Sequence, residues 1–267
     1  MPIVVEKLSH TYMHKSALAV SAINDVSIVI NEGEFLCIVG HTGSGKSTFI
    51  QHLNGLLLPT SGSVMVDGCD MLDKKQRQIG RRLVGMVFQY PEHQLFEETV
   101  YKDVAFGPVN MGLSEAEVKE RVMNALSIVG LDADKFCGKS PFELSGGEKR
   151  RVALAGIIAM HPKYLVLDEP MAGLDPSGRN AILDTLLELQ RANNTCIIMV
   201  SHSMDDIARV ATRVAIFSKG ALRTVGTPAE VFSDAGEIEK LGLELPHAAQ
   251  LAQALRKRGV NVPNEIY

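Results

Sequence analysis

Short apolar segments alternate with amphipathic segments along most of this chain. Gly, Asp and Asn residues bound the apolar segments, and the clearest of these cover residues 35–39, 83–88, 164–167, 195–200 and 213–217. Unbroken apolar runs of this length are typical of strands buried on both faces, and strands that alternate with helices favour a parallel sheet. The pattern therefore predicts an α/β fold with a mostly parallel sheet flanked by helices.

Two further regions differ from this pattern. The β-rich pieces IVVEKL and DVSIVI in the first 30 residues, with SVMVDG further on, predict an antiparallel β layer packed on the parallel core. The chain turns helical between Gln89 and His161. Within this block Ser114 with Glu117, and Ser145 with Glu148, match the capping box that opens a helix.

This organisation predicts where the domains divide. We expect a main domain at residues 1–235, with a helical subdomain inserted at about residues 91–160. A short C-terminal helical extension is expected at residues 236–267.

Composition narrows the class of protein. The formal charge of -4 gives no reason to expect a nucleic-acid partner, because such proteins usually carry a basic excess. The 4 cysteines lack metal or redox spacing, which is typical of reduced thiols in a cytosolic protein. No apolar stretch approaches the roughly 20 residues that span a bilayer, and the first ten residues do not resemble a signal peptide. If the protein serves a membrane, other chains must cross it.

The strongest chemical signal is the loop GHTGSGKS at residues 40–47. Glycines let successive backbone N–H groups point at phosphate oxygens, and the helix that follows adds the positive end of its dipole. Lys46 supplies a charge to the β- and γ-phosphates, and the Ser47 hydroxyl can ligate Mg²⁺. The loop by itself suits a kinase, a GTPase or a motor. The predicted phosphate contacts are Gly40, His41, Thr42, Gly43, Ser44, Gly45, Lys46, Ser47 and Thr48.

Two strand ends carry candidate hydrolytic residues. Asp168 ends one apolar strand and is placed to hold the magnesium ion, while Glu169 beside it can act as general base toward water. His202 follows another strand, at the edge where open α/β sheets bind ligands. A strand that ends in two carboxylates is common, and a histidine at a strand end is often only a polar cap.

The segment LSGGE at residues 144–148 predicts a second anion-binding helix start. Ser145, Gly146 and Gly147 leave a hydroxyl and backbone donors open to an anion. A well-capped helix without a ligand fits the same residues. Because the chain already has one phosphate loop, we expect this second helix start to serve a nucleotide held by a partner chain.

Taken in order, these motifs resemble those of the ABC-transporter ATPases over nearly the whole chain. The family has the fold of P-loop NTPases, with a RecA-like sheet. Residues 40–47 resemble its Walker A motif, Gln89 its Q-loop glutamine, residues 144–148 its signature motif, residues 165–169 its Walker B motif, residues 172–175 its D-loop, and His202 its switch histidine.

The resemblance implies a head-to-tail dimer that binds ATP between two chains. Ser145 and Gly147 would complete the γ-phosphate site of the partner, and Asp175 would reach across the interface. Gln89 would bind Mg²⁺ and couple to membrane subunits, and Tyr12 would stack on adenine. Glu148 stands where the family usually has Gln, and MAGLD stands where SALD is common; neither departure indicates an inactive site.

A narrower resemblance concerns the run from Gln89 to Pro108, which is similar to the ATPases of energy-coupling factor transporters, most of all the second of their two paralogous ATPases. This implies ATP hydrolysis that energises import of vitamins or transition-metal ions at the cytoplasmic face of the cell membrane. The implied partners are a paralogous ATPase, a transmembrane coupling protein that docks near residues 91–106, and a substrate-binding membrane protein. An ordinary surface helix is the alternative for that segment.

Two other functions compete with this interpretation. A soluble ABC ATPase acting as a clamp in DNA repair or translation usually carries a long coiled coil or two cassettes, and this chain shows neither. A small-molecule kinase would explain the phosphate loop but not LSGGE.

Overall fold

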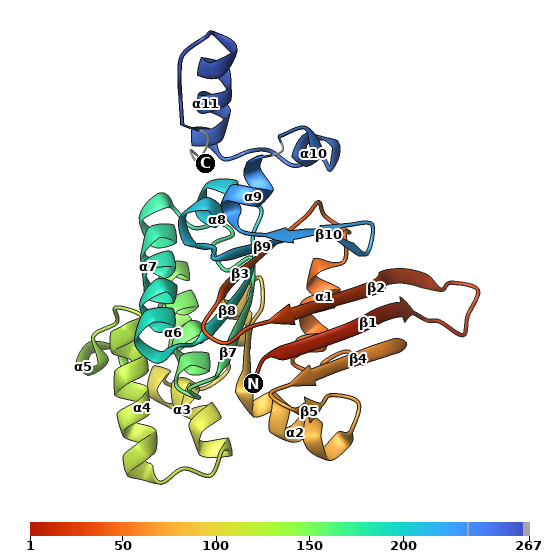
Figure 1. Cartoon of the computed structure of the whole chain (residues 1–267). Coiled ribbons are helices and arrows are strands. Elements are labelled where there is room, and N and C mark those ends of the chain that lie inside the picture. The colour runs from red at the N-terminus through yellow and green to blue at the C-terminus, as the bar shows by residue number, and fades with distance from the viewer. Residues whose placement is uncertain (234, 264–267) are drawn as a thin grey trace. The chain divides into compact units, whose positions relative to one another are not determined.

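The computed structural model describes residues 1–233 and 235–263, and the chain divides into two compact units (Figure 1). The first unit combines residues 1–81 with residues 196–267, and the second comprises residues 82–195. The domain limit predicted near residue 235 does not coincide with these divisions and stays a prediction.

An antiparallel sheet opens the first unit. Its strand order is β2-β1-β4-β5, with β1 at Ile3–Tyr12, β2 at Val20–Ile30, β4 at Ser61–Val66 and β5 at Cys69–Asp70. Buried and exposed residues alternate along much of β2, as expected for strands with only one face in the core. The predicted β layer is confirmed, and its strands β1 and β2 are longer than the apolar pieces indicated because their outer ends are polar.

Parallel strands form the core of the first unit. β3 at Phe35–Val39 pairs in parallel with β8 at Cys196–Val200 and with β9 at Arg213–Ser218. β10 at Ala221–Gly226 adds an antiparallel edge to β9. Every residue of β3 and β8 is buried, which explains why both are continuous apolar runs. The helices of this part are α1 at Lys46–Leu53, α2 at Lys74–Leu83, α8 at Met204–Val210, α9 at Pro228–Ser233, α10 at Ala235–Lys240 and α11 at His247–Lys257.

The turn between β9 and β10 joins the two layers of this unit. The amide of Asn24 on β2 donates to the carbonyl of Gly220 at 2.8 Å. Gly220 has a φ of 77°, and a Cβ there would lie 2.7 Å from the carbonyl oxygen of Ala22. Only glycine allows so close an approach, so the turn holds β2 directly against the parallel strands.

The second unit is mostly helical. Its strands β6 at Val84–Val87 and β7 at Tyr164–Asp168 are parallel neighbours. Helix α6 packs against α3, α4 and β6, and both predicted capping boxes are present, at the starts of α4 and α6. The helices are η1 at Pro91–Gln94, α3 at Val100–Asn110, α4 at Glu115–Ile128, α5 at Ala133–Phe136, η2 at Pro141–Glu143, α6 at Gly146–Ile158 and α7 at Pro176–Asn193.

Two further expectations bear on the class of protein. None of the helices in the described part of the chain is long and apolar enough to cross a membrane. All four cysteines are free, and burial raises the pKa of the Cys37 and Cys196 thiols, so both remain protonated. The five predicted core strands are all present, with ends that shift by a residue or so.

A buried histidine makes the stability of this fold depend on pH. His52 on α1 is 0% exposed, and burial lowers its pKa from 6.5 to about 4, with a smaller contribution from neighbouring His10. Between these two pH values the unfolded chain binds a proton that the folded chain does not. The free energy of unfolding should therefore fall as the pH decreases from 6.5 to 4, by up to about 3 kcal/mol from this residue.

Denaturant titrations at pH 7 and pH 4.5 test this dependence. The variant His52→Leu should lose less stability than the native chain on acidification. The control His14→Leu, at an exposed position, should behave as the native chain. An equal loss in the His52 variant and the native chain would show that His52 is not the group responsible.

Candidate nucleotide site

The phosphate loop lies between β3 and α1, as the sequence predicts. Gly40 has a φ of 153°, and a Cβ there would lie 2.3 Å from the carbonyl oxygen of Phe217 on β9. Gly45, the residue before α1, has a φ of 100° and would place a Cβ 2.6 Å from the carbonyl oxygen of Ala22. Both positions exclude any side chain, so these two glycines are required by the packing of the loop itself.

Polar groups of the loop face inward. Lys46 is buried, and its ammonium group donates to the carbonyls of Gly40 at 2.6 Å and His41 at 3.1 Å. The Ser44 hydroxyl is buried and has no hydrogen-bond partner among the described residues. A buried hydroxyl without a partner costs free energy, and a phosphate oxygen of a bound nucleotide would provide the missing acceptor. The arrangement thus fits the predicted phosphate contact.

A cavity of about 450 Å³ lies beside the phosphate loop within the first unit. It brings His41 and Thr42 of the loop to the same cavity as His202, which is exposed after β8. The remaining lining residues are Ser203, Met204, Asp205, Gly242, Leu243, Glu244, Leu245 and His247.

The C-terminal residues of this cavity were not predicted from the sequence. The backbone amide of His247 donates to Asp205 at 2.8 Å, and the His247 ring also contacts that carboxylate. Asp205 therefore caps the start of α11 and fixes it beside His202. No motif signals this contact, because the two residues are far apart in the sequence.

Tyr12 ends β1 and is 40% exposed, so part of this residue is accessible to a ligand. Its hydroxyl lies 3.1 Å from the hydroxyl of Thr48 in the first turn of α1. Tyr12, which is predicted to stack on adenine, is therefore in contact with α1, the helix that follows the phosphate loop.

In the second unit, the structure brings Gln89 and Glu169 together. The Gln89 amide donates to the Glu169 carboxylate at 3.1 Å. The two residues follow β6 and β7, and the carboxyl ends of parallel strands meet at one edge of a sheet. Glu169 has a φ of 48°, a strained conformation for a side chain other than glycine, while Asp168 before it is buried. Carboxylate and amide oxygens such as those of Asp168 and Gln89 are ligands that suit Mg²⁺.

Ser145 is the N-cap of α6, and its contacts show how the Glu148 departure is accommodated. One carboxylate oxygen of Glu148 accepts from the Ser145 amide at 2.8 Å and from its hydroxyl at 2.7 Å. These bonds from Ser145 lower the pKa of Glu148, so the residue is ionised and completes the capping box in place of glutamine. Asp175 likewise caps α7, by accepting from the Gly178 amide at 3.1 Å.

Packing within the described residues does not require the two glycines of the signature motif. Gly146 and Gly147 are exposed, and a Cβ at either would meet none of the described atoms within 4 Å. Glycine in a helix interior costs roughly 1 kcal/mol relative to alanine, so alanine at these positions would favour the helix itself. The glycines leave the start of α6 open at its surface.

Arg150, also on α6, was not predicted as a site residue. Its buried guanidinium donates to both oxygens of Glu92 on η1, with a closest distance of 3.1 Å. It also donates to the carbonyl of Ala172 at 2.5 Å. Burial raises the pKa of the Glu92 carboxyl, but the hydrogen bonds and charge of Arg150, together with a backbone hydrogen bond of Glu92 itself and the charge of His93, lower the pKa overall. Arg150 thus joins the segments after Gln89 and after Glu169 to α6, which begins with the signature motif and is called the signature helix below.

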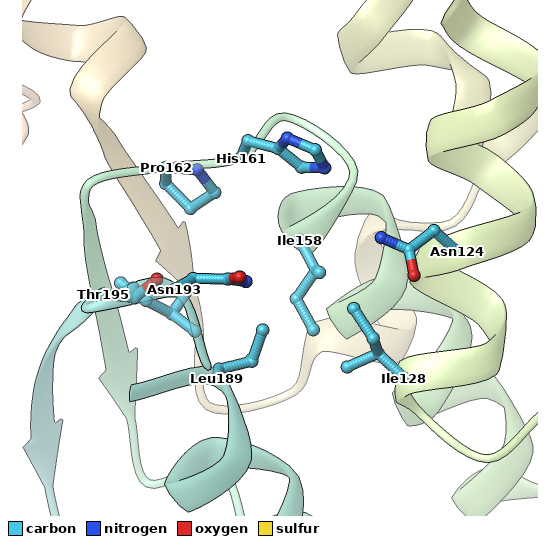
Figure 2. A pocket seen from close by; sticks show the side chains of 9 residues that line it. Asn124, Ile128, Ile158, His161, Pro162, Leu189, Asn193 and Thr195 are labelled. Carbon is cyan, nitrogen blue, oxygen red and sulfur yellow. The ribbon is translucent and has the colours of Figure 1, made fainter. Parts of the chain in front are cut away.

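A second cavity, of about 260 Å³, lies inside the second unit (Figure 2). Its wall combines apolar side chains with polar ones, and Figure 2 shows the amides of Asn124 and Asn193 directed into it from α4 and α7. None of the predicted nucleotide residues lines this cavity.

The chain is similar to proteins of a known family. The sequence profile of the ABC transporter family matches residues 23–172. Energy-coupling factor transporter ATP-binding protein EcfA2 of Caldanaerobacter subterraneus subsp. tengcongensis is 53% identical over 100% of this chain and 93% of its own length. EcfA2 of Symbiobacterium thermophilum is 54% identical over 100% of this chain and 92% of its own length.

Solved structures show the same fold. CbiO1 from Clostridium perfringens, described as part of the ABC transporter complex cbiONQ, has a TM-score of 0.79 and 38% identity, and the match covers 94% of this chain and 98% of CbiO1. A dimeric ATP-binding cassette in a post-hydrolysis state with ADP and Pi has a TM-score of 0.75 and 28% identity, covering 85% of this chain and 98% of its own.

The chain belongs to the ABC transporter family, as one of its ATPase subunits. Within that family it is similar over its full length to the ATP-binding subunits of energy-coupling factor transporters. The predicted fold, ATPase class and narrower group are confirmed, and neither the clamp nor the kinase alternative accounts for these relatives.

The Arg150 contacts give a stability prediction. Arg150→Met should lower the free energy of unfolding by about 2 kcal/mol, since it leaves the Glu92 carboxylate without its partner. The loss is smaller than for a fully buried pair because 21% of the Glu92 side chain is exposed. Arg151→Met, at the next position of the same helix, is the matched control and should cost less. Equal losses in denaturant titrations of the two variants would contradict the special role of Arg150.

Proposed function

We propose that this chain binds Mg²⁺ and ATP and hydrolyses the ATP as one half of a head-to-tail ATPase dimer. The open glycines of the signature helix carry this proposal, because they cost stability and meet no packing demand from the described residues. In the dimer, Ser145 and Gly147 would complete the γ-phosphate site of the partner, with Gly146 allowing close approach. Asp175, exposed at the start of α7, would reach across the same interface.

Each predicted site residue of the first unit has a role in nucleotide binding. Backbone amides of residues 40–48 and the Ser44 hydroxyl would hold phosphate oxygens, and Lys46 would exchange its two carbonyl partners for the β- and γ-phosphates. Tyr12 would stack on adenine, and His202 would contact the γ-phosphate.

The residues after β6 and β7 would carry the hydrolytic step. Glu169, whose carboxylate accepts a hydrogen bond from the Gln89 amide, would accept the proton of the attacking water. Ser47, Gln89 and Asp168 would supply the oxygen ligands of Mg²⁺, which neutralises charge on the β- and γ-phosphates when it is bound.

The exposed aromatic surface after Gln89 supports docking of a transmembrane coupling protein near residues 91–106. Phe96 and Phe106 pack edge to face at 4.9 Å, yet remain 57% and 48% exposed. Tyr90 and Val109 are exposed as well. Large apolar side chains gathered on a surface mark an interaction site. This surface favours docking over the alternative of an ordinary surface helix.

The complex would therefore be an energy-coupling factor importer of vitamins or transition-metal ions, with this chain peripheral at the cytoplasmic face of the membrane. The relatives support assembly with a paralogous ATPase rather than an identical copy, because their names carry the designation A2. CbiO1, a structural relative, is itself part of a transporter complex. A substrate-binding membrane protein would provide specificity, so this chain need not contact the transported molecule.

Replacement of the proposed base should separate binding from hydrolysis. Glu169→Gln should retain ATP binding and slow hydrolysis by about 100-fold or more, because only the proton acceptor is removed. The assay uses the reconstituted ATPase pair in which the base of the mate is also replaced. Lys46→Ala should weaken ATP binding itself. Normal turnover in the Glu169 variant, or unchanged ATP affinity in the Lys46 variant, would refute the corresponding role.

The docking surface can be tested by co-purification. Phe96→Ser with Phe106→Ser should reduce recovery of this chain with its membrane subunits by about tenfold, through loss of buried apolar area. Ile79→Ser is the control, because Ile79 is 59% exposed but lies on α2. Recovery of the double variant at the native level would place docking elsewhere.

A further inference from the structure

Three aromatic rings form a column from the surface to the core of the first unit. We call Tyr12, His10 and His52 the ring column. The rings of Tyr12 and His10 meet edge to face at 4.6 Å, and those of His10 and His52 at 4.8 Å. Exposure falls along the column, from 40% at Tyr12 to 0% at His52. The ring column therefore connects an exposed platform with the buried side of α1.

The hydrogen bonds of the column are consistent with one set of tautomers. His52 Nδ1 lies 2.7 Å from the Thr48 carbonyl, so this nitrogen is the donor and Nε2 is the acceptor. His10 Nδ1 lies 3.2 Å from that acceptor and 3.1 Å from the Leu58 carbonyl, which makes His10 Nδ1 a donor to both. Rotation of either ring would break these bonds, so the ring orientations are fixed.

Both ends of the column hold the first turn of α1. The Thr48 carbonyl accepts from His52, and the Thr48 hydroxyl lies 3.1 Å from the Tyr12 hydroxyl. Thr48 directly follows Ser47 of the phosphate loop. The orientation of the Tyr12 ring is thereby tied to the helix that carries the phosphate loop.

Packing alone does not explain two imidazoles at this place. His10 Nε2 is buried without a hydrogen-bond partner in the described part of the chain, which is a cost that an apolar ring would avoid. An apolar ring at this position would lose the hydrogen bonds that His10 Nδ1 makes, so these bonds are the reason for an imidazole here.

We propose that His10, held by its hydrogen bonds to His52 and Leu58, is a positioning residue that sets the Tyr12 ring for base stacking. This proposal rests on the adenine role of Tyr12 under the proposed function. It adds that discrimination between a nucleotide and a bare phosphate chain depends on the two histidines beneath the platform.

The test compares a ligand that has a base with one that lacks it. The affinity of the full-length chain for ATP and for inorganic tripolyphosphate, both with Mg²⁺, is measured by calorimetry. His10→Phe keeps an aromatic ring but removes the hydrogen bonds. It should lower the affinity for ATP about fivefold, because part of the base-stacking contribution is lost. The affinity for tripolyphosphate should be unchanged. His10→Ala provides the same comparison should the larger ring distort the fold, which thermal melting reports. His14→Phe is the control at an exposed position and should bind both ligands as the native chain.

A double variant decides whether His10 acts through Tyr12. Tyr12→Ala should lower the affinity for ATP at least as much as His10→Phe does. Adding His10→Phe to Tyr12→Ala should lower the affinity no further. Native ATP affinity in His10→Phe, or an equal fall for both ligands, would overturn the positioning role while the adenine role of Tyr12 stands. Native ATP affinity in Tyr12→Ala would overturn both.

Discussion

The phosphate loop depends on backbone atoms that approach too closely for any side chain. Gly40 lies against the carbonyl of Phe217, and Gly45 against that of Ala22. The amide of Gly220 donates to the carbonyl of Ser44 at 3.0 Å, while the Gly220 carbonyl accepts from Asn24. The loop is therefore clamped between the β9–β10 turn and β2, and this clamp fixes where Lys46, Ser44 and the start of α1 lie.

Glycines serve two distinct purposes in this chain. Those of the phosphate loop satisfy the chain itself, because their replacement would create steric overlap. Those of the signature helix are not required by packing in the part of the chain that the structure describes, and they weaken the helix that contains them. This contrast is the physical basis for the proposal that the chain carries one phosphate loop of its own and a signature helix that serves the nucleotide of a partner.

Several site residues are also structural caps or anchors. Ser145 and Glu148 complete a capping box, Asp175 caps α7, and Arg150 binds Glu92 together with the Ala172 carbonyl. The same capping geometry at Ser114 and Glu117 occurs where no ligand is expected. Capping alone therefore does not identify a site, and the exposed glycines provide the additional observation at α6.

The sequence by itself determined the family and the core strands, and it supplied most residues of the candidate site as predictions, since motif spacing and apolar runs are local properties of the chain. The strand β10 escaped prediction because its half-exposed residues form no apolar run. Only the tertiary structure brought His10 against His52, Arg150 against Glu92, and Asp205 against His247. Each of these contacts joins residues that are distant along the chain, and side-chain packing, rather than any local pattern, decides which of them meet.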